Sequence, residues 1–230
     1  METFFPAQVK IGADGWNWDD WVGALYPEGT KKDSYLSEYA KHYDVVEVDS
    51  TFYRIPSQKT VRQWFDQTPD KFSFAVKVPR GVTHTAFHDD YLDRLDYFVR
   101  IMKNLEWKLG PILFQFPFYN QAKFPSVAAF IEKFEPVLER LPQEILPAVE
   151  VRNKDWVTEE FLSFLRRQNA AFVLVDHPWA ERAEILMERL DVITAGFCYI
   201  RWLGHQTKVE KLTDRWDHLV LDKRRATSRW

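Results

Sequence analysis

Four ionisable side chains, Glu47, Lys77, Glu150 and Arg201, each lie inside a short apolar run of the sequence. Two carboxylates in different environments can divide the roles of general acid and general base, and Glu47 and Glu150 are the leading candidates. A lysine such as Lys77 could instead form a Schiff base. An arginine such as Arg201 binds a carboxylate or phosphate through two hydrogen bonds. These residue types predict acid–base chemistry on a small anionic substrate.

Further candidates lie in similar runs and in the loops that follow them. Asp176 joins Glu47, Glu150 and Lys77 as a catalytic candidate. Aromatic rings in these loops can stack on a sugar or a base, or can pack the loops onto the fold as a small core. Charged side chains can hold an anion, or can form a closed ion-pair network that only caps the core. The predicted substrate-binding residues are Asp14, Trp16, Asp49, Thr51, Tyr53, His84, Gln115, Arg152, Arg201 and His205.

The sequence contains no familiar cofactor motif. It has only 8 glycines, and neither GxGxxG nor GxxxxGK[ST] occurs. His84 and His88 are spaced i, i+4, but the string HTAFH lacks the glutamate of a zinc-binding HExxH motif. We therefore expect no cofactor and no dedicated metal ligands. A divalent metal held by histidines together with Glu47, Glu150 and Asp176 is the open alternative.

Strand-like and helical patterns alternate from end to end. Apolar stripes of period 3.6 predict helices over residues 89–105 and after Pro125, and Ser57 and Thr158 are expected to cap two further helices. Alternation without hairpin signals predicts parallel strands joined by crossovers. Seven runs are predicted strands, at residues 9–14, 45–51, 72–79, 112–117, 147–152, 171–176 and 197–202.

The position of a residue within its run predicts the face of the sheet to which its side chain belongs. Successive strand residues point to opposite faces. Polar side chains therefore share one face, opposite a larger apolar face that should pack against the helices. The predicted inward-facing residues include Glu47, Lys77, Gln115, Glu150 and Arg201. They should meet at the mouth of a barrel, where the sites of such folds lie.

The spacing of the runs indicates one α/β domain over residues 1–230. The repeat is about 31 residues, the size of a βα unit. A (β/α)8 TIM-type barrel needs about 250 residues, so with seven strands identified we expect the eighth strand and its helix to be missing. The last predicted helix covers residues 213–230. An open sheet edge at this point invites self-association.

Composition limits the class of protein and of partner. The chain has 31 Lys and Arg against 34 Asp and Glu, a net charge of −3, which argues against nucleic acid as a partner. The first residues do not read as a signal peptide, and no apolar run is long enough to span a membrane. The single cysteine, Cys198, suits a reducing compartment. We therefore expect a cytoplasmic protein with a small anionic ligand.

Several long strings follow one another in order along the chain: GADGWNWDDWVGALYP, VVEVDSTFYRIPS, FSFAVKVPRGVTH, KLGPILFQFP, AVEVRNKDW and YIRWLG. Through these strings the sequence resembles the YecE-like family, described as domain of unknown function 72, from Ile11 to about Trp230. The resemblance implies a TIM-type barrel and no established reaction. Asp14 and Asp49 stand where the family tends to have Ser and Asn, and the family's Asn-rich closing segment does not appear.

These observations lead to three hypotheses about function. The first is a hydrolase- or lyase-like enzyme that acts by general acid–base chemistry on a phosphorylated or acidic sugar- or nucleotide-like substrate. The second is a metal-dependent phosphodiester hydrolase. The third is a non-catalytic ligand-binding or interaction module.

Overall fold

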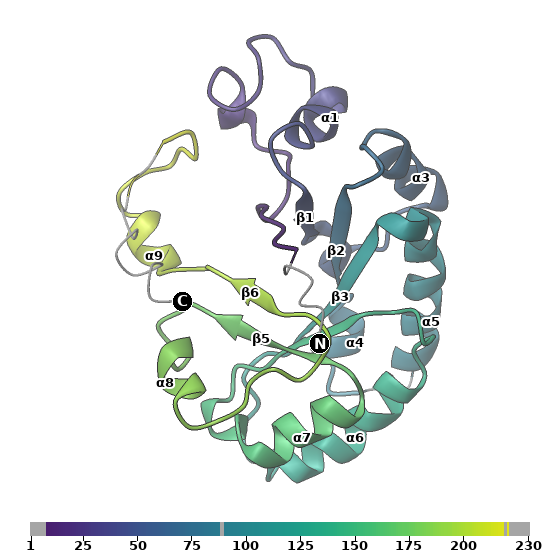
Figure 1. Ribbon diagram of the computed structural model, residues 1–230, viewed down its shortest axis with the longest axis vertical. Coiled ribbons are helices and arrows are strands. Elements are labelled where there is room, and N and C mark those ends of the chain that lie inside the picture. The colour runs from purple at the N-terminus through teal and green to yellow at the C-terminus, as the bar shows by residue number, and fades with distance from the viewer. Residues whose placement is uncertain (1–7, 88–89, 219, 221–230) are drawn as a thin grey trace, which may run out of the picture.

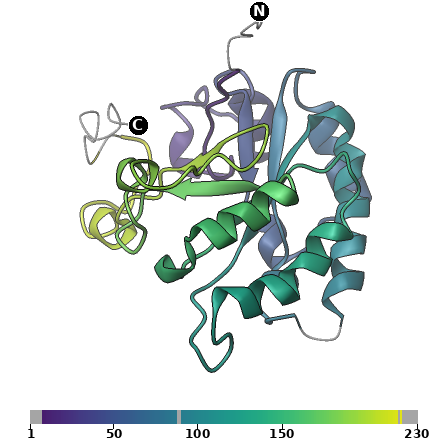
Figure 2. The ribbon, with the colours of Figure 1, turned by 60° about the horizontal axis from the view of Figure 1, so that its bottom comes forward.

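A six-stranded parallel sheet organises the chain in the computed structural model, which describes residues 8–87, 90–218 and 220. The strand order follows the sequence from β1 to β6, and all neighbours are parallel. The sheet curls into half a barrel with its larger helices on the outside (Figures 1 and 2). The strands are β1 (Val45–Val48), β2 (Ser73–Lys77), β3 (Leu109–Gln115), β4 (Pro147–Glu150), β5 (Ala171–Val175) and β6 (Tyr199–Arg201).

Helices occupy the connections between the strands. The α-helices are α1 (Tyr35–Tyr39), α2 (Ser50–Tyr53), α3 (Gln58–Asp66), α4 (Arg80–Thr83), α5 (Tyr91–Met102), α6 (Val127–Glu139), α7 (Glu159–Arg167), α8 (Ala183–Met187) and α9 (Gln206–Val209). Four 3-10 helices cover Asp19–Trp21, Lys32–Ser34, Lys103–Lys108 and Lys154–Trp156. None of the helices among the described residues has both the length and the apolar character needed to cross a membrane.

Two of the helix starts confirm predicted capping residues. The hydroxyl of Ser57 accepts a hydrogen bond from the backbone N–H of Thr60 at 3.1 Å, before α3. The hydroxyl of Thr158 accepts one from Phe161 at the start of α7. In each case the side chain satisfies a backbone donor that the first turn of a helix leaves without a partner.

The prediction of a strand over residues 9–14 was wrong. Only Asp14 forms a bridge with β1, opposite Glu47. Val9 and Ile11 are 76% and 59% exposed, so the residues before this bridge bury no apolar face that would hold them against the sheet. Gly15 then adopts a φ of 78°, which ends the extended run. The described residues therefore form six strands instead of the seven predicted, and no eighth strand is found among them. A short segment lies beside β1 in place of the first predicted strand.

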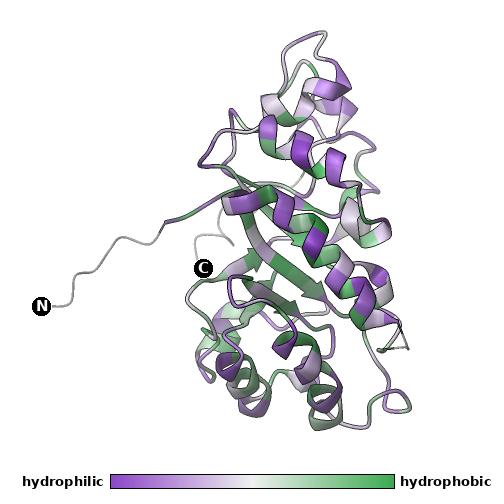
Figure 3. Cartoon of the chain, turned by 90° about the vertical axis from the view of Figure 1, so that its right-hand side faces the viewer, coloured by the Kyte–Doolittle hydropathy of each residue, from purple (hydrophilic) through white to green (hydrophobic). Residues whose placement is uncertain are grey.

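The two faces of the sheet differ as the strand periodicity predicted, except on β5, where the prediction that Val175 faces the helices and Asp176 the inside was wrong: Val175 lies on the inner face beside Arg201. The outer face belongs to a large core that includes Val46, Phe74 and Phe114 together with residues of α5, α6 and α7. Figure 3 shows the apolar strands under helices whose surfaces are mixed in polarity. On the inner face the apolar cluster is small: Leu113, Ala148, Ala171, Val173 and Val175. The polar side chains of the strands lie on this inner face.

A contact between distant loops spans the side on which β1 and β6 are not paired. The indole N–H of Trp21 donates to the carbonyl of Trp216 at 2.9 Å. The rings of Trp18 and Trp216 have centroids 5.8 Å apart. Residues 213–218 are not helical, and the rest of the predicted helix over 213–230 falls outside the described residues apart from residue 220, which is also not helical. The aromatic loop after Asp14 thus packs against a distant segment of chain.

Candidate functional site

A buried ion triad connects the two edge strands of the sheet across its inner face. Arg201 of β6 donates to both carboxylate oxygens of Glu47 on β1, at 2.9 and 2.6 Å. Its third hydrogen bond goes to Glu150 of β4 at 2.6 Å. The side chains of Arg201, Glu47 and Glu150 are only 8%, 10% and 0% exposed. Burial alone would lower the pKa of Arg201, but the two carboxylates raise it above its ordinary range.

Tyr199 belongs to this group and was missed at the level of sequence. Its hydroxyl donates to Glu47 at 2.6 Å. Tyr199 lies two residues before Arg201 on β6 and so shares its face, a signal that the strand periodicity already contained. Burial, and then the charge of Glu47, raise the pKa of Tyr199 well above its ordinary value. The phenol therefore remains protonated and holds Glu47 in place.

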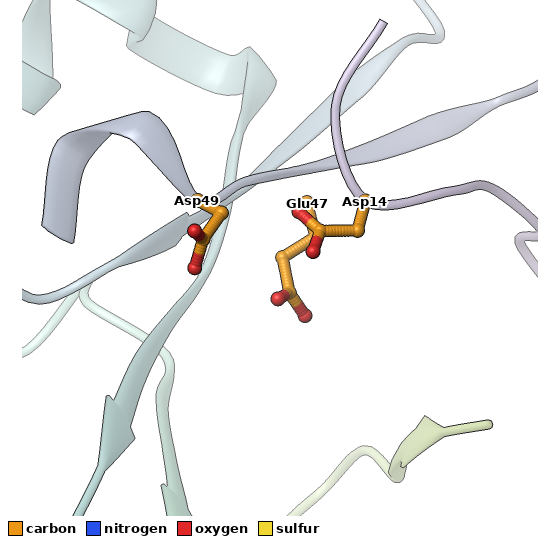
Figure 4. Close-up of side chains that lie close together, drawn as sticks. All are labelled: Asp14, Glu47 and Asp49. Atoms are coloured by element: carbon orange, nitrogen blue, oxygen red, sulfur yellow. The ribbon is translucent and has the colours of Figure 1, made fainter. Parts of the chain in front are cut away.

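Three carboxyl groups converge at the carboxyl end of β1. Asp14, Glu47 and Asp49 each offer an oxygen within 4.8 Å of the other two, and Figure 4 shows the three side chains projecting to the same side of the strand. Asp49 is held by the ammonium of Lys77 at 2.7 Å. Lys77 also lies 4.3 Å from the centre of the Phe52 ring. Among the described residues no hydrogen bond or ion pair holds the carboxyl of Asp14.

The pKa of Asp14 is shifted toward neutral pH. Removal from water by the surrounding protein atoms, followed by repulsion from Glu47 and Asp49, raises the pKa of Asp14 to about 7. Asp14 nevertheless stays exposed, so water reaches its carboxyl and screens both effects. An exposed carboxyl that titrates near pH 7 can take up and release protons in the range where enzymes work.

Glu150 and Arg152 contain two buried polar atoms without hydrogen-bond partners in the part of the chain that the structure describes. These are Oε1 of Glu150 and Nε of Arg152, which lie 4.0 Å apart. The other oxygen of Glu150 is bound by Arg201. The guanidinium of Arg152 lies 5.2 Å from the centre of the Trp179 ring, and its side chain is 40% exposed. This corner of the inner face is therefore charged and incompletely satisfied.

Three other predicted site residues make contacts within the protein close to this group. Thr51 is in α2 rather than on a strand, and its hydroxyl lies 2.8 Å from the carbonyl of Val48 and 2.6 Å from that of Lys77. Gln115 is buried and donates to the carbonyl of Phe116. His84 packs on Phe52, and its burial, followed by the charges of Lys77 and Arg152, lowers its pKa to about 4. His84 is therefore neutral at physiological pH.

The contacts given for the remaining predicted residues are with other parts of the protein than the carboxyl cluster. Trp16 is 7% exposed and packs edge-on against Trp64, so its ring belongs to the core. Tyr53 is 76% exposed on α2. The Nδ1 atom of His205 lies 3.0 Å from the hydroxyl of Thr207. Asp176 follows β5, where its backbone N–H donates to the carbonyl of Arg201. His88 lies outside the described residues.

The carboxylates could hold a divalent cation. Oxygen ligands of Asp14, Glu47 and Asp49 suit a hard ion such as Mg²⁺ or Mn²⁺. Arg201 and Lys77 already neutralise two of the three, so a metal would compete with both. Of the ligands named at the sequence level, only Glu47 is part of this cluster.

Two clefts of about 510 Å³ each lie away from these carboxyl groups. One is lined by Asp96, Arg100, Arg140 and neighbouring residues, and the other by Tyr53, Arg80, Arg94, Tyr97 and their neighbours. Neither includes a member of the ion triad or of the carboxyl cluster. We place the candidate site on the inner face, because buried charges and a shifted pKa indicate function more directly than the size of a hollow.

The fold and this group of charges define a class: an α/β protein with a curled parallel sheet and ionisable groups on its inner face. The family model described as Protein of unknown function DUF72 matches residues 10–228, and the chain belongs to this family. The resemblance noted in the sequence is thereby confirmed.

Known relatives agree with this assignment. The chain is similar to the UPF0759 protein YunF of Bacillus subtilis, with 28% identity over 180 residues, which cover 74% of this chain and 61% of YunF. It is also similar to the UPF0759 protein YecE of Escherichia coli K12, with 30% identity over 146 residues, which cover 63% of this chain and 48% of YecE. The chain therefore matches about three fifths and about half of the lengths of these curated relatives.

Solved structures show the same architecture. The crystal structure of a DUF72 family protein from Thermotoga maritima matches with a TM-score of 0.74 and 28% identity, over 96% of this chain and 85% of that chain. A DUF72 family protein from Enterococcus faecalis matches with a TM-score of 0.65 and 21% identity, over 96% of this chain and 77% of that one. The second likeness is one of fold alone.

Proposed function

We propose that this protein is a cytoplasmic, hydrolase- or lyase-like enzyme that acts by general acid–base chemistry on a small anionic substrate. Its half-barrel sheet would be the greater part of a (β/α)8 barrel, whose carboxyl end carries the site. The substrate would be phosphorylated or acidic and sugar- or nucleotide-like. Nucleic acid is not the expected substrate, because the chain carries a net charge of −3.

One observation carries the proposal: the carboxyl of Asp14, which has no described partner, lies beside two carboxylates that cations hold in place. Glu47 and Glu150 both bind Arg201 through hydrogen-bonded ion pairs, whereas Asp14 has no such described partner. We therefore give the proton-transfer role to Asp14, and give Glu47 and Glu150 the role of positioning it and Arg201. Its pKa of about 7 fits the role.

The anionic part of the substrate would bind Arg152. Arg201 and Lys77 are engaged by carboxylates within hydrogen-bond distance, whereas Arg152 lies 4.0 Å from the nearest oxygen of Glu150 and is 40% exposed. A planar guanidinium with exposed N–H groups can bind a phosphate or a carboxylate through two hydrogen bonds.

A metal-dependent phosphodiester hydrolase is the second candidate. It is favoured by the same three carboxyl groups, since oxygen atoms within 4.8 Å of one another could bind one divalent cation. Under this alternative Asp14 would be a ligand instead of a proton carrier. A module that binds a ligand without converting it is the third candidate.

Turnover of a defined panel tests the proposal. Wild type and Asp14→Asn would be incubated with glycerol 3-phosphate, glucose 6-phosphate, 6-phosphogluconate, gluconate and adenosine 5′-monophosphate, and products followed by NMR. We expect conversion by wild type and a loss of about 10²–10⁴-fold in kcat for the variant, as for a general acid or base. Asp70→Asn is the matched control, because Asp70 is exposed and precedes β2, at the opposite end of the strand from Lys77.

Each outcome has a fixed meaning. Conversion by wild type with an ionisation near pH 7 that disappears in Asp14→Asn would support the proposal. Full activity of Asp14→Asn would refute the role of Asp14. Hydrolysis of bis(p-nitrophenyl) phosphate that requires added Mg²⁺ or Mn²⁺ would favour the second candidate instead. Binding of panel compounds without any conversion would overturn the enzyme proposal in favour of a ligand module.

A further inference from the structure

Two buried polar atoms with unsatisfied hydrogen-bonding capacity lie near each other on the inner face. Oε1 of Glu150 is an acceptor and Nε of Arg152 a donor, and both are buried without a partner among residues 8–87, 90–218 and 220. They are 4.0 Å apart, too far for a hydrogen bond with each other. Leaving a buried polar group unsatisfied is costly, so native proteins normally fill such a position with a water or a ligand.

The geometry restricts the chemistry of any group that could bind both atoms at once. If an oxygen lay about 2.8 Å from each atom, the angle at that oxygen between Oε1 and Nε would be about 90°. This is a reasonable angle for one atom that makes two hydrogen bonds. The group must accept from the N–H of Arg152 and donate to the carboxylate of Glu150. A fully ionised phosphate or carboxylate oxygen cannot donate, and an ammonium group cannot accept. A hydroxyl or a water satisfies both partners.

Arg152 also borders a small cavity. Arg152, Val175 and Trp179 help to line this space of about 30 Å³, whereas Glu150 is not among its lining residues. The exposed part of the Arg152 side chain reaches solvent. One arginine can therefore contact a hydroxyl through Nε and an anion through its other nitrogens.

We propose that Glu150 and Arg152 form a subsite for a substrate hydroxyl next to the anionic group, so that the substrate is a hydroxylated phosphate or hydroxy acid. This inference rests on the proposed function, because it uses the anion that Arg152 binds there. In the absence of substrate, a water takes the place of the hydroxyl. Glu150 and Arg152 select for a hydroxyl because its absence leaves both atoms unsatisfied again.

Two pairs of compounds that differ in their hydroxyls test the subsite. Glycerol 3-phosphate would be compared with propyl phosphate, and glycerate with propionate, by calorimetric titration of the full chain. We expect the hydroxylated member of at least one pair to bind at least 10-fold more tightly. Arg152→Lys keeps the charge but loses the fixed Nε–H, so we expect it to bind both members of that pair with similar affinity. Arg167→Lys, on an exposed arginine of α7, is the matched control and should keep the preference.

The result that would overturn the inference is equal affinity within both pairs, or no binding of any of the four compounds to wild type. The position would then hold an ordinary buried water only. A hydroxyl preference that Arg152→Lys retains would also overturn it. This failure is distinct from failure of the proposed function. Loss of turnover in Asp14→Asn without a hydroxyl preference would refute only the proposed subsite. A hydroxyl preference without turnover would refute only the proposed enzymatic activity.

Discussion

Removal of Arg201 should destabilise the fold far more than removal of an exposed arginine with similar contacts. In Arg201→Met, Glu47 and Glu150 would remain as carboxylates that are 10% and 0% exposed, without their cation. Breaking a buried ion pair in this way costs about 3–5 kcal/mol. At about 2–4 °C per kcal/mol for a chain of this size, the midpoint of thermal unfolding should fall by roughly 6–20 °C. Circular dichroism and urea unfolding would measure both quantities.

Arg140 provides the control. It donates three hydrogen bonds to Asp96, at 2.9, 3.0 and 2.5 Å, but both side chains are nearly half exposed. Arg140→Met should therefore cost about 1 kcal/mol or less. Combining Arg201→Met with Glu47→Gln and Glu150→Gln should recover much of the loss, because no buried charge is then left alone. A loss in Arg201→Met no larger than in Arg140→Met would refute this reasoning.

Two further predictions concern the segment beside β1. The folded-state pKa of Asp14, about 7, exceeds the ordinary 3.8, so the folded state holds an extra proton between these values and wild-type stability falls as pH rises through them. The stability of Asp14→Asn relative to wild type should therefore rise by about 1 kcal/mol between pH 4 and pH 8. This is less than the full pKa shift implies, because water screens the exposed carboxyl. Urea unfolding that shows the same stability difference at both pH values would contradict this prediction. A Cβ on Gly12 would lie 1.8 Å from the carbonyl oxygen of Val45, so Gly12→Ala should cost about 1–3 kcal/mol in urea unfolding. Gly196→Ala, which has open space around it, should cost much less, and equal losses would show that crowding is not the cause.

The faces of the strands could be predicted from sequence because a strand has a fixed period of two residues. That rule placed Glu47, Lys77, Gln115, Glu150 and Arg201 on one side of the sheet, and the structure confirms it. The rule applied equally to Tyr199, which was overlooked because a tyrosine among apolar residues looks like part of the core. The rule ends where the strand ends: Asp49 and Thr51 follow the last residue of β1, and Thr51 lies in α2.

The pairing of the charges could not be predicted, because it depends on how far the sheet curls. Arg201 and Glu47 are 154 residues apart and lie on the two strands that have only one neighbour each. Strand parity gives the same face for both residues but not the distance between them. The pKa of Asp14 could not be predicted for the same reason, since it depends first on removal of the carboxyl from water and then on two carboxylates from another segment. The prediction of a strand over residues 9–14 failed because a local pattern does not show burial. Apolar residues such as Val9 and Ile11 fit a strand whether or not another part of the protein covers them.

The balance of charge on the inner face links the proposed substrate to the direction of proton transfer. Lys77, Arg152 and Arg201 face the carboxylates Glu47, Asp49 and Glu150, which leaves Asp14 as the carboxyl that decides the net charge. A bound anion that extends from Arg152 toward Asp14 would bring negative charge to that carboxyl and raise its pKa above 7. An anionic substrate would therefore favour the protonated form of Asp14, which makes this residue a general acid on binding. A neutral substrate would leave Asp14 divided between acid and base near pH 7, so proton uptake on binding would distinguish the two classes of substrate.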